Sequence, residues 1–106
     1  MNPIVASAAC AAMLLLISAP ASASAELART KYCMNCHGFG SGIVGPGYRE
    51  IAVRRSGEPG AEASLAQRIR HGSSGEWGRT AMPANAVSAD EAAQLARWIL
   101  SLAPGR

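Results

Sequence analysis

Charged side chains are absent from the first 25 residues of this 106-residue chain, because all ten Lys and Arg and all seven Asp and Glu lie at position 26 or later. Within that stretch, residues 4–17 are almost entirely apolar, and Pro20 follows them. A short apolar run that gives way to small residues is typical of a secretory signal peptide. The run is too short and too rich in small side chains to favour a transmembrane span.

Two small-x-small sequences that suit signal cleavage follow Pro20, Ala21-Ser22-Ala23 and Ala23-Ser24-Ala25. We therefore expect a signal peptide over residues 1–25, export to the periplasm, and a mature chain that starts at Ser24 or Glu26. No Lys or Arg precedes the apolar run, so an uncleaved anchor is the alternative. The expected mature domain, residues 26–106, is small enough to need help beyond its own apolar core.

The sequence also lacks a run of basic residues, any internal repeat and any convincing strand pattern. Its net charge of +3 is mild and scattered, and Lys31 is its only Lys. This distribution argues against a nucleic-acid partner. The absence of strand signals predicts an all-α fold.

Four segments of the chain carry helical signals. Residues 27–35 follow Glu26, whose charge suits the positive end of a helix dipole. Residues 46–55 form a second, short candidate, with Tyr48, Ile51 and Ala52 turned inward. Residues 61–71 place apolar side chains at helical spacing and stop before Gly72.

The last helical segment, residues 88–102, has the clearest pattern. Ser88 and Glu91 form a capping box. An apolar stripe follows, with Trp98 expected at its edge; the stripe consists of Ala92, Leu95, Ile99 and Leu102. Between the helical segments, residues 38–47 are crowded with glycine and residues 72–87 carry Gly, Ser, Pro and Asn, so both stretches predict loops.

Only three cysteines are present, and Cys10 lies within the predicted signal peptide. The other two belong to the sequence Cys33-Met34-Asn35-Cys36-His37, which is the C-x-x-C-H motif of covalent haem attachment. Two cysteines three positions apart lie on one face of a helical turn, where each can form a thioether with one haem vinyl group. The adjacent His37 can then bind the iron. The motif predicts one covalent haem c.

Other uses of the same residues are less well supported. A dithiol redox motif would sit beside a strand–helix–strand pattern, which is missing. A zinc site would need a fourth ligand, for which only His71 is available. Chance occurrence of the motif in a short exported chain is the third alternative.

The second axial position of the iron has two candidates in the mature chain. Met82 lies in the irregular 72–87 stretch and belongs to no helical stripe, although a gap-filling core Met is the alternative. His71 lies at the end of a helix, where a His often complements the helix dipole instead.

The mature chain resembles the small class I bacterial cytochromes c of the cytochrome c-551 type, nearly from end to end. The matching segments are Cys33 to His37, Val44-Gly45-Pro46-Gly47-Tyr48, Gly60-Ala61-Glu62 with Leu65 to Ile69, His71-Gly72-Ser73, Trp77-Gly78, Met82-Pro83, Asn85 to Ser88, Asp90-Glu91-Ala92, and Leu95-Ala96 with Trp98. The resemblance implies about four short helices wrapped around one covalently attached haem. One departure is visible, because Arg54-Arg55 stands where such proteins tend to carry a large apolar residue, which would reshape the rim.

The resemblance also implies a role for several single residues. Met82 would be the sixth iron ligand, and the carbonyl of Pro46 would hold the ring N–H of His37. Arg68 and Trp77 would donate to the haem propionates. Asn85 would donate toward the sulfur of Met82.

His–Met ligation leaves no open iron position and favours Fe(II), which suits an electron carrier rather than an enzyme. We expect a monomeric periplasmic shuttle between a membrane cytochrome complex as donor and a periplasmic reductase or oxidase as acceptor, with no stable membrane insertion. Two alternatives are a haem subunit of a larger dehydrogenase and a peroxidase or gas-binding haem protein. For the peroxidase, His71 and Arg79 are the only distal candidates, and neither lies in a supporting motif.

Overall fold

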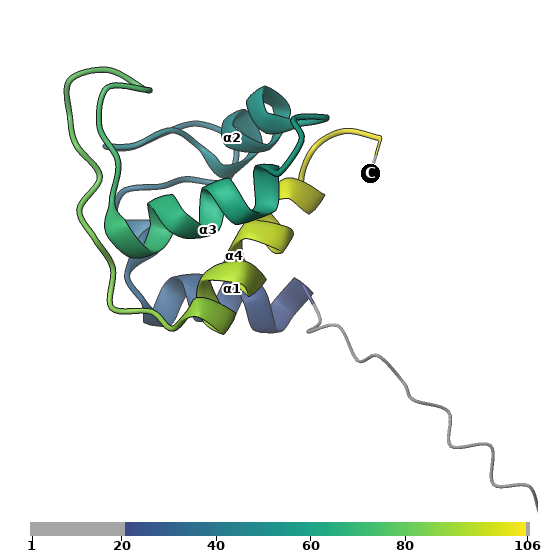
Figure 1. The fold of residues 1–106 in the computed structure, drawn as a ribbon, viewed down its shortest axis with the longest axis horizontal. Coiled ribbons are helices and arrows are strands. Elements are labelled where there is room, and N and C mark those ends of the chain that lie inside the picture. Colours follow the sequence, from purple (N-terminus) through teal and green to yellow (C-terminus); the bar gives the residue numbers. More distant parts are fainter. Residues whose placement is uncertain (1–20, 106) are drawn as a thin grey trace, which may run out of the picture.

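The structure is a computed structural model, and it describes residues 21–105. Four α-helices lie in the order α1 (Ala21–Thr30), α2 (Tyr48–Arg55), α3 (Ala61–His71) and α4 (Ala89–Ser101). A short 3-10 turn, η1 (Cys33–Asn35), follows α1. Helix α4 packs against α1, α2 and α3, and the irregular segment between α3 and α4 arches outward before it returns beside α1 (Figure 1). Within residues 21–105 no strand forms, which confirms the predicted all-α fold.

The first helix differs from the prediction. A single helix over residues 27–35 was expected, but α1 begins at Ala21 and ends at Thr30. Tyr32 adopts a left-handed backbone with a φ of 65°, which a right-handed helix cannot continue, and η1 starts after it. The earlier start has a packing reason, since Ser24 and Ala28 are buried and Gln94 Nε2 of α4 donates to Ser24 Oγ at 3.3 Å.

The predicted signal peptide lies mostly outside the described residues, which start at Ala21. Its last five residues form the first half of α1 in the full-length chain. Its cleavage site therefore stays a prediction. In residues 21–105, no helix has the length and apolar character needed to cross a membrane.

The second and third helices follow the sequence pattern closely. Helix α2 starts at Tyr48, two residues later than predicted, and buries Tyr48, Ile51 and Ala52 as expected. The N–H of Gly47 donates to Glu50 Oε1 at 3.1 Å and satisfies one donor at the helix start. Helix α3 spans the predicted residues and ends at Gly72, whose φ of 84° few other residues adopt at low cost.

The last helix supplies the centre of the core. The predicted capping box forms, because Glu91 N–H donates to Ser88 Oγ at 3.1 Å and Ser88 N–H donates to Glu91 Oε1 at 2.9 Å. These contacts lower the pKa of Glu91. The predicted edge position of Trp98 is wrong, since this side chain is 6% exposed. Its ring packs edge to face on Tyr48 at 5.0 Å and on Phe39 at 5.9 Å, so helix α2 and the loop before it cover the indole.

Replacing Ser88 with Ala should lower the free energy of unfolding by about 1 kcal/mol, because the N–H of Glu91 loses its acceptor at the start of α4. Chemical denaturation of the purified protein measures this difference. Ser41→Ala, an exposed serine in the glycine-rich loop, is the matched control and should be neutral within about 0.5 kcal/mol. Equal stabilities of the two variants would show that the cap contributes nothing.

Candidate functional site

A large cleft lies between the helices and the two irregular segments. It encloses about 1340 Å³, including the part open to solvent. Apolar side chains from four helices form its inner wall, and these include Ala28, Ile51, Leu65, Ile69, Leu95 and Ile99. A partly enclosed, mainly apolar cleft is the usual form of a cofactor site.

The haem-attachment motif lies along one wall of this cleft. Cys33, Cys36 and His37 all line it, and both sulfurs are free thiols. The turn η1 and the bonds from the Cys36 and His37 N–H groups to Cys33 O, at 3.1 and 3.0 Å, hold the three side chains in one compact turn. Burial raises the pKa of the Cys33 thiol, although a bond to its own backbone opposes the change.

The imidazole of His37 is fixed by the loop that follows the motif. Its Nδ1 lies 2.7 Å from the carbonyl oxygen of Pro46. A carbonyl can only accept, so Nδ1 carries a proton, and in the neutral imidazole Nε2 then keeps a free lone pair. The His37–Pro46 contact implied by the resemblance is thus present. The ring also stacks on Tyr48, with centroids 5.6 Å apart.

Gly45 explains why the glycine-rich loop can approach this ring so closely. A Cβ at position 45 would lie 2.7 Å from Cε1 of His37 and 3.1 Å from its Nδ1. The N–H of Gly45 also donates to Cys36 O at 2.9 Å. The backbone therefore occupies space next to the imidazole that a side chain would need.

Met82 reaches the same cleft from the other irregular segment. It lines the cleft, and its backbone pairs with Ser73 through two bonds of 2.8 and 3.1 Å. This two-residue bridge was not predicted, because neither residue lies in a strand pattern. Gly72 makes room for it, since a Cβ there would lie 2.6 Å from the carbonyl oxygen of Met82.

The rival ligand, His71, is placed differently. It is exposed at the end of α3 and does not line the cleft. Asn85 lines the cleft, but its amide donates to the carbonyls of Ile69 at 2.9 Å and Pro83 at 3.3 Å. Both amide hydrogens are therefore engaged with backbone, and the expected contact from Asn85 to the sulfur of Met82 is not formed in this structure.

Arg68 and Trp77, the expected propionate donors, both line the cleft. Arg68 Nη2 donates to Glu76 Oε1 at 2.6 Å, and Arg68 Nη1 bonds Ser64 Oγ. Trp77 is 38% exposed, and Arg54 lies over its ring with 4.4 Å between the guanidinium carbon and the centroid. The structure thus brings both residues to the site, while Arg68 already has a carboxylate partner.

Sequence reasoning missed two residues of this wall, Arg55 and Glu76. The two line the cleft and are joined by a bond of 2.8 Å from Arg55 Nη2 to Glu76 Oε2. Burial opposes ionisation of both groups, yet the bonds between them prevail, so the pKa of Glu76 is lowered and the pKa of Arg55 is raised. The run Arg54-Arg55 was a visible departure from the family pattern, but its partner Glu76 lies far along the chain.

The residues around the cleft fit a haem. One wall offers two free thiols and an imidazole nitrogen with a free lone pair, and the inner wall is apolar. Two buried polar atoms of cleft-lining residues, Tyr48 Oη and Arg55 Nε, have no hydrogen-bond partner. A buried donor without a partner is rare in a folded protein unless a further group satisfies it.

Known proteins with the same features are cytochromes. A family model described as cytochrome c matches residues 21–103. Cytochrome c-551 of Pseudomonas aeruginosa is 52% identical over 75 residues, which cover 71% of this chain and 72% of that protein. Cytochrome c-552 of Hydrogenobacter thermophilus is 44% identical over 80 residues, covering 76% of this chain and 82% of that protein. The crystal structure of wild-type Nitrosomonas europaea cytochrome c552 matches with a TM-score of 0.72 at 42% identity, covering 74% of this chain and 98% of that one.

The chain therefore belongs to the cytochrome c family. It has the small all-α fold of the class I cytochromes c and is of the c-551 type. As a member of this group it is an electron-transfer protein with one covalent haem c, and not an enzyme.

Replacing Gly45 with Ala should displace the His37 ring or the loop, because the added methyl group would overlap the imidazole. We expect the holoprotein to lose about 1–3 kcal/mol of stability, the usual cost of overpacking. Thermal or chemical unfolding followed at the haem absorption band measures the loss.

Gly40→Ala is the control for this variant. It lies in the same loop, and a Cβ there meets nothing within 4 Å. The prediction fails if the variants at positions 40 and 45 unfold at the same denaturant concentration and have the same spectrum.

Proposed function

We propose that this cytochrome carries single electrons in the periplasm, between a membrane respiratory complex and a terminal reductase or oxidase. The observation that supports the proposal best is the convergence of His37 and Met82, from segments far apart in the sequence, on one apolar cleft. The haem, when bound, supplies a one-electron Fe(III)/Fe(II) couple. The signal peptide at residues 1–25 directs the chain to that compartment, where it acts as a monomer.

In this proposal each residue of the cleft has a defined task. Cys33 and Cys36 form the two thioethers, and His37 binds the iron through Nε2 because Nδ1 is engaged by Pro46. Met82 would offer a neutral thioether as a second iron ligand, which favours Fe(II) and raises the potential. With His37 and Met82 both bound, substrates would have no access to the metal.

The segment that carries Met82 is well suited to hold a ligand in one place. The bridge to Ser73 fixes its backbone, and Asn85 fastens the next turn to the end of α3 through Ile69. Asn85 therefore orients the Met82 segment through its backbone contacts. A ligand that is held in the same place in both oxidation states needs little rearrangement, which suits a shuttle.

The surface at the mouth of the cleft offers an apolar docking face. Ile43 and Val44 are 68% and 59% exposed, and Pro83 and Ala84 beside Met82 are exposed as well. Val44 and Pro83 also line the cleft, so this face borders the cofactor site. Redox partners meet the protein here through apolar contact, with arginines at a distance that orient them weakly.

The rate of electron transfer to a natural partner should therefore fall only modestly as salt increases, because charges contribute little to the docking face. Stopped-flow kinetics over a range of ionic strengths measure this dependence. A fall of several orders of magnitude would contradict the proposed face. Ile43→Lys should slow the reaction at every salt concentration, and Val53→Lys, at a residue of α2 that is 58% exposed, is the control.

Replacing Met82 with Ala should leave the haem attached, because Cys33 and Cys36 are unchanged. We expect the iron to become accessible to carbon monoxide and cyanide, and the reduction potential to fall, because the ligand that favours Fe(II) is lost. Peroxidase activity should appear for the same reason. Absorption spectra with and without carbon monoxide, together with a potentiometric titration, test these expectations.

His71→Ala is the matched control and should change none of these properties, since His71 lies outside the cleft. An accessible iron in the His71 variant and not in the Met82 variant would reverse the ligand assignment. Ready binding of carbon monoxide by the wild-type ferrous protein would instead favour a gas-binding or enzymatic role.

A further inference from the structure

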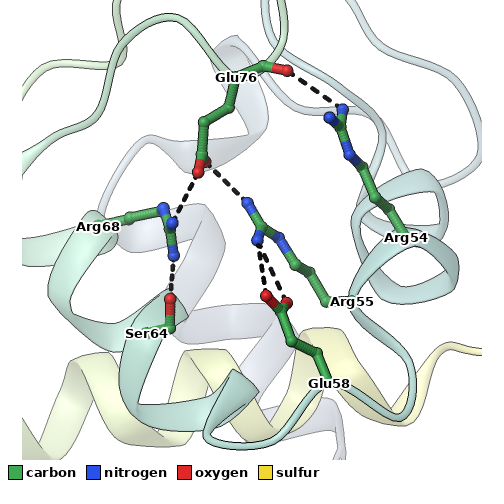
Figure 2. Close-up of polar contacts among 6 residues, drawn as sticks. All are labelled: Arg54, Arg55, Glu58, Ser64, Arg68 and Glu76. Carbon is green, nitrogen blue, oxygen red and sulfur yellow. Dashed lines mark hydrogen bonds and ion pairs between the residues drawn. The ribbon is translucent and has the colours of Figure 1, made fainter.

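Glu76 is the centre of a polar cluster at one end of the cleft, shown in Figure 2. Its carboxylate lies between Arg55 of α2 and Arg68 of α3, at 2.8 and 2.6 Å. Its backbone carbonyl accepts a bond of 3.1 Å from Arg54 Nη1. One residue of the segment that leads to Met82 is thus held by side chains from two helices.

Arg55 is the most buried of the three arginines, with 11% of its side chain exposed, and it lines the cleft. Its Nη1 donates to the carboxylate of Glu58 at 3.2 Å, and its Nη2 donates to Glu76. Its Nε is buried without an acceptor. A charged N–H group that is removed from water needs a hydrogen-bond acceptor. The protein itself provides no acceptor for Arg55 Nε, so we expect a bound ligand to supply it.

The charges of the cluster point to the kind of acceptor. Arg55 and Arg68 pair with the carboxylates of Glu58 and Glu76, and Arg54 bonds the backbone carbonyl of Glu76, so the cluster has one positive charge in excess. Arg79 is the remaining charged side chain that lines the described cleft, and it adds to that excess. Most of the other lining residues are apolar or uncharged. An anionic group of a ligand in the cleft is therefore best accommodated at this end.

We propose that Arg55 binds a haem propionate through its Nε–H, and that Glu76 positions Arg55 and Arg68 for this contact. The proposal rests on the haem-binding function given above, since a propionate is the anionic group that a haem brings into the cleft. A planar guanidinium can serve three carboxylates at once, one at each nitrogen, which a Lys ammonium on a flexible stem does less well. Glu76 then keeps two like-charged arginines close together at the same end of the site.

The test uses the holoprotein and follows the propionates by NMR with a carbon-labelled haem. Arg55→Gln removes the cation and should raise the pKa of one propionate by about one unit, a tenfold change in proton affinity, because a carboxylate loses its nearby positive charge. The reduction potential should fall, since the less compensated negative charge favours Fe(III). The reduction potential falls with rising pH as the propionate loses its proton. In Arg55→Gln this fall should occur at a higher pH, by the same amount as the change in the propionate pKa.

Three further variants separate a direct contact from a structural effect. Arg55→Lys keeps the charge, so it should restore most of the propionate pKa, and Glu76→Gln carries the test if the Arg55→Gln variant does not accumulate. Glu76→Gln removes a negative charge and should raise the potential, opposite to Arg55→Gln. Arg49→Gln, an exposed arginine on the same helix, makes the same charge change away from the cleft and should shift neither property.

The proposal is overturned if the propionates of the Arg55→Gln variant titrate as in the wild type, or if Arg55→Gln and Arg49→Gln shift them equally. That result would leave the haem protein intact as a carrier. Failure of the function itself has a separate signature, because wild-type protein would then lack covalent haem or the spectrum of a His–Met iron.

Discussion

The hydrogen bond between His37 Nδ1 and the Pro46 carbonyl is the contact on which the rest of the site depends. It fixes which ring nitrogen is free, and it can form only if the loop returns to within contact distance of the imidazole. Gly45 permits that approach, because a side chain there would overlap the ring. The same return places Tyr48, whose N–H donates to Gly38 O at 2.8 Å, at the start of α2. One contact therefore couples the metal-binding motif to the packing of the second helix.

Local sequence signals predicted much of this molecule, because they act over a few residues. The capping box at Ser88 and the stop at Gly72 form as expected, and the inward face of α2 is buried. The predicted bounds of the first helix were wrong at both ends, because tertiary packing and a backbone conformation outweigh the local signal there. Ser24 packs against α4 and extends the helix towards the N-terminus, whereas the left-handed Tyr32 ends it early. Neither effect leaves a periodic trace in the sequence.

Contacts between distant segments account for what sequence reasoning could not predict. The spacing of the cysteines and His37 predicts covalent haem attachment. No spacing in the sequence predicts that Arg55 will contact Glu76, or that Ser73 will pair with Met82. Asn85 shows the same limit. Its presence beside Met82 suggested a bond to sulfur, whereas the fold brings the carbonyl of Ile69 within 2.9 Å of its amide nitrogen. A backbone acceptor next to the amide is the stronger partner, because thioether sulfur is a weak one.

The segment from Gly72 to Val87 has no helix or strand, so its rigidity has to come from individual hydrogen bonds and ion pairs. The bridge at Ser73 and the amide of Asn85 hold the stretch on either side of Met82, and Glu76 fastens its outer arch to α2 and α3. These ties are polar, and the ion pairs among them are only partly exposed, so salt screens them less than it screens surface pairs. Hydrogen bonds and ion pairs to two helices thus hold this loop in place, as the regular backbone hydrogen bonds of a helix hold its turns. They leave the apolar side chains of the loop free to face the cofactor.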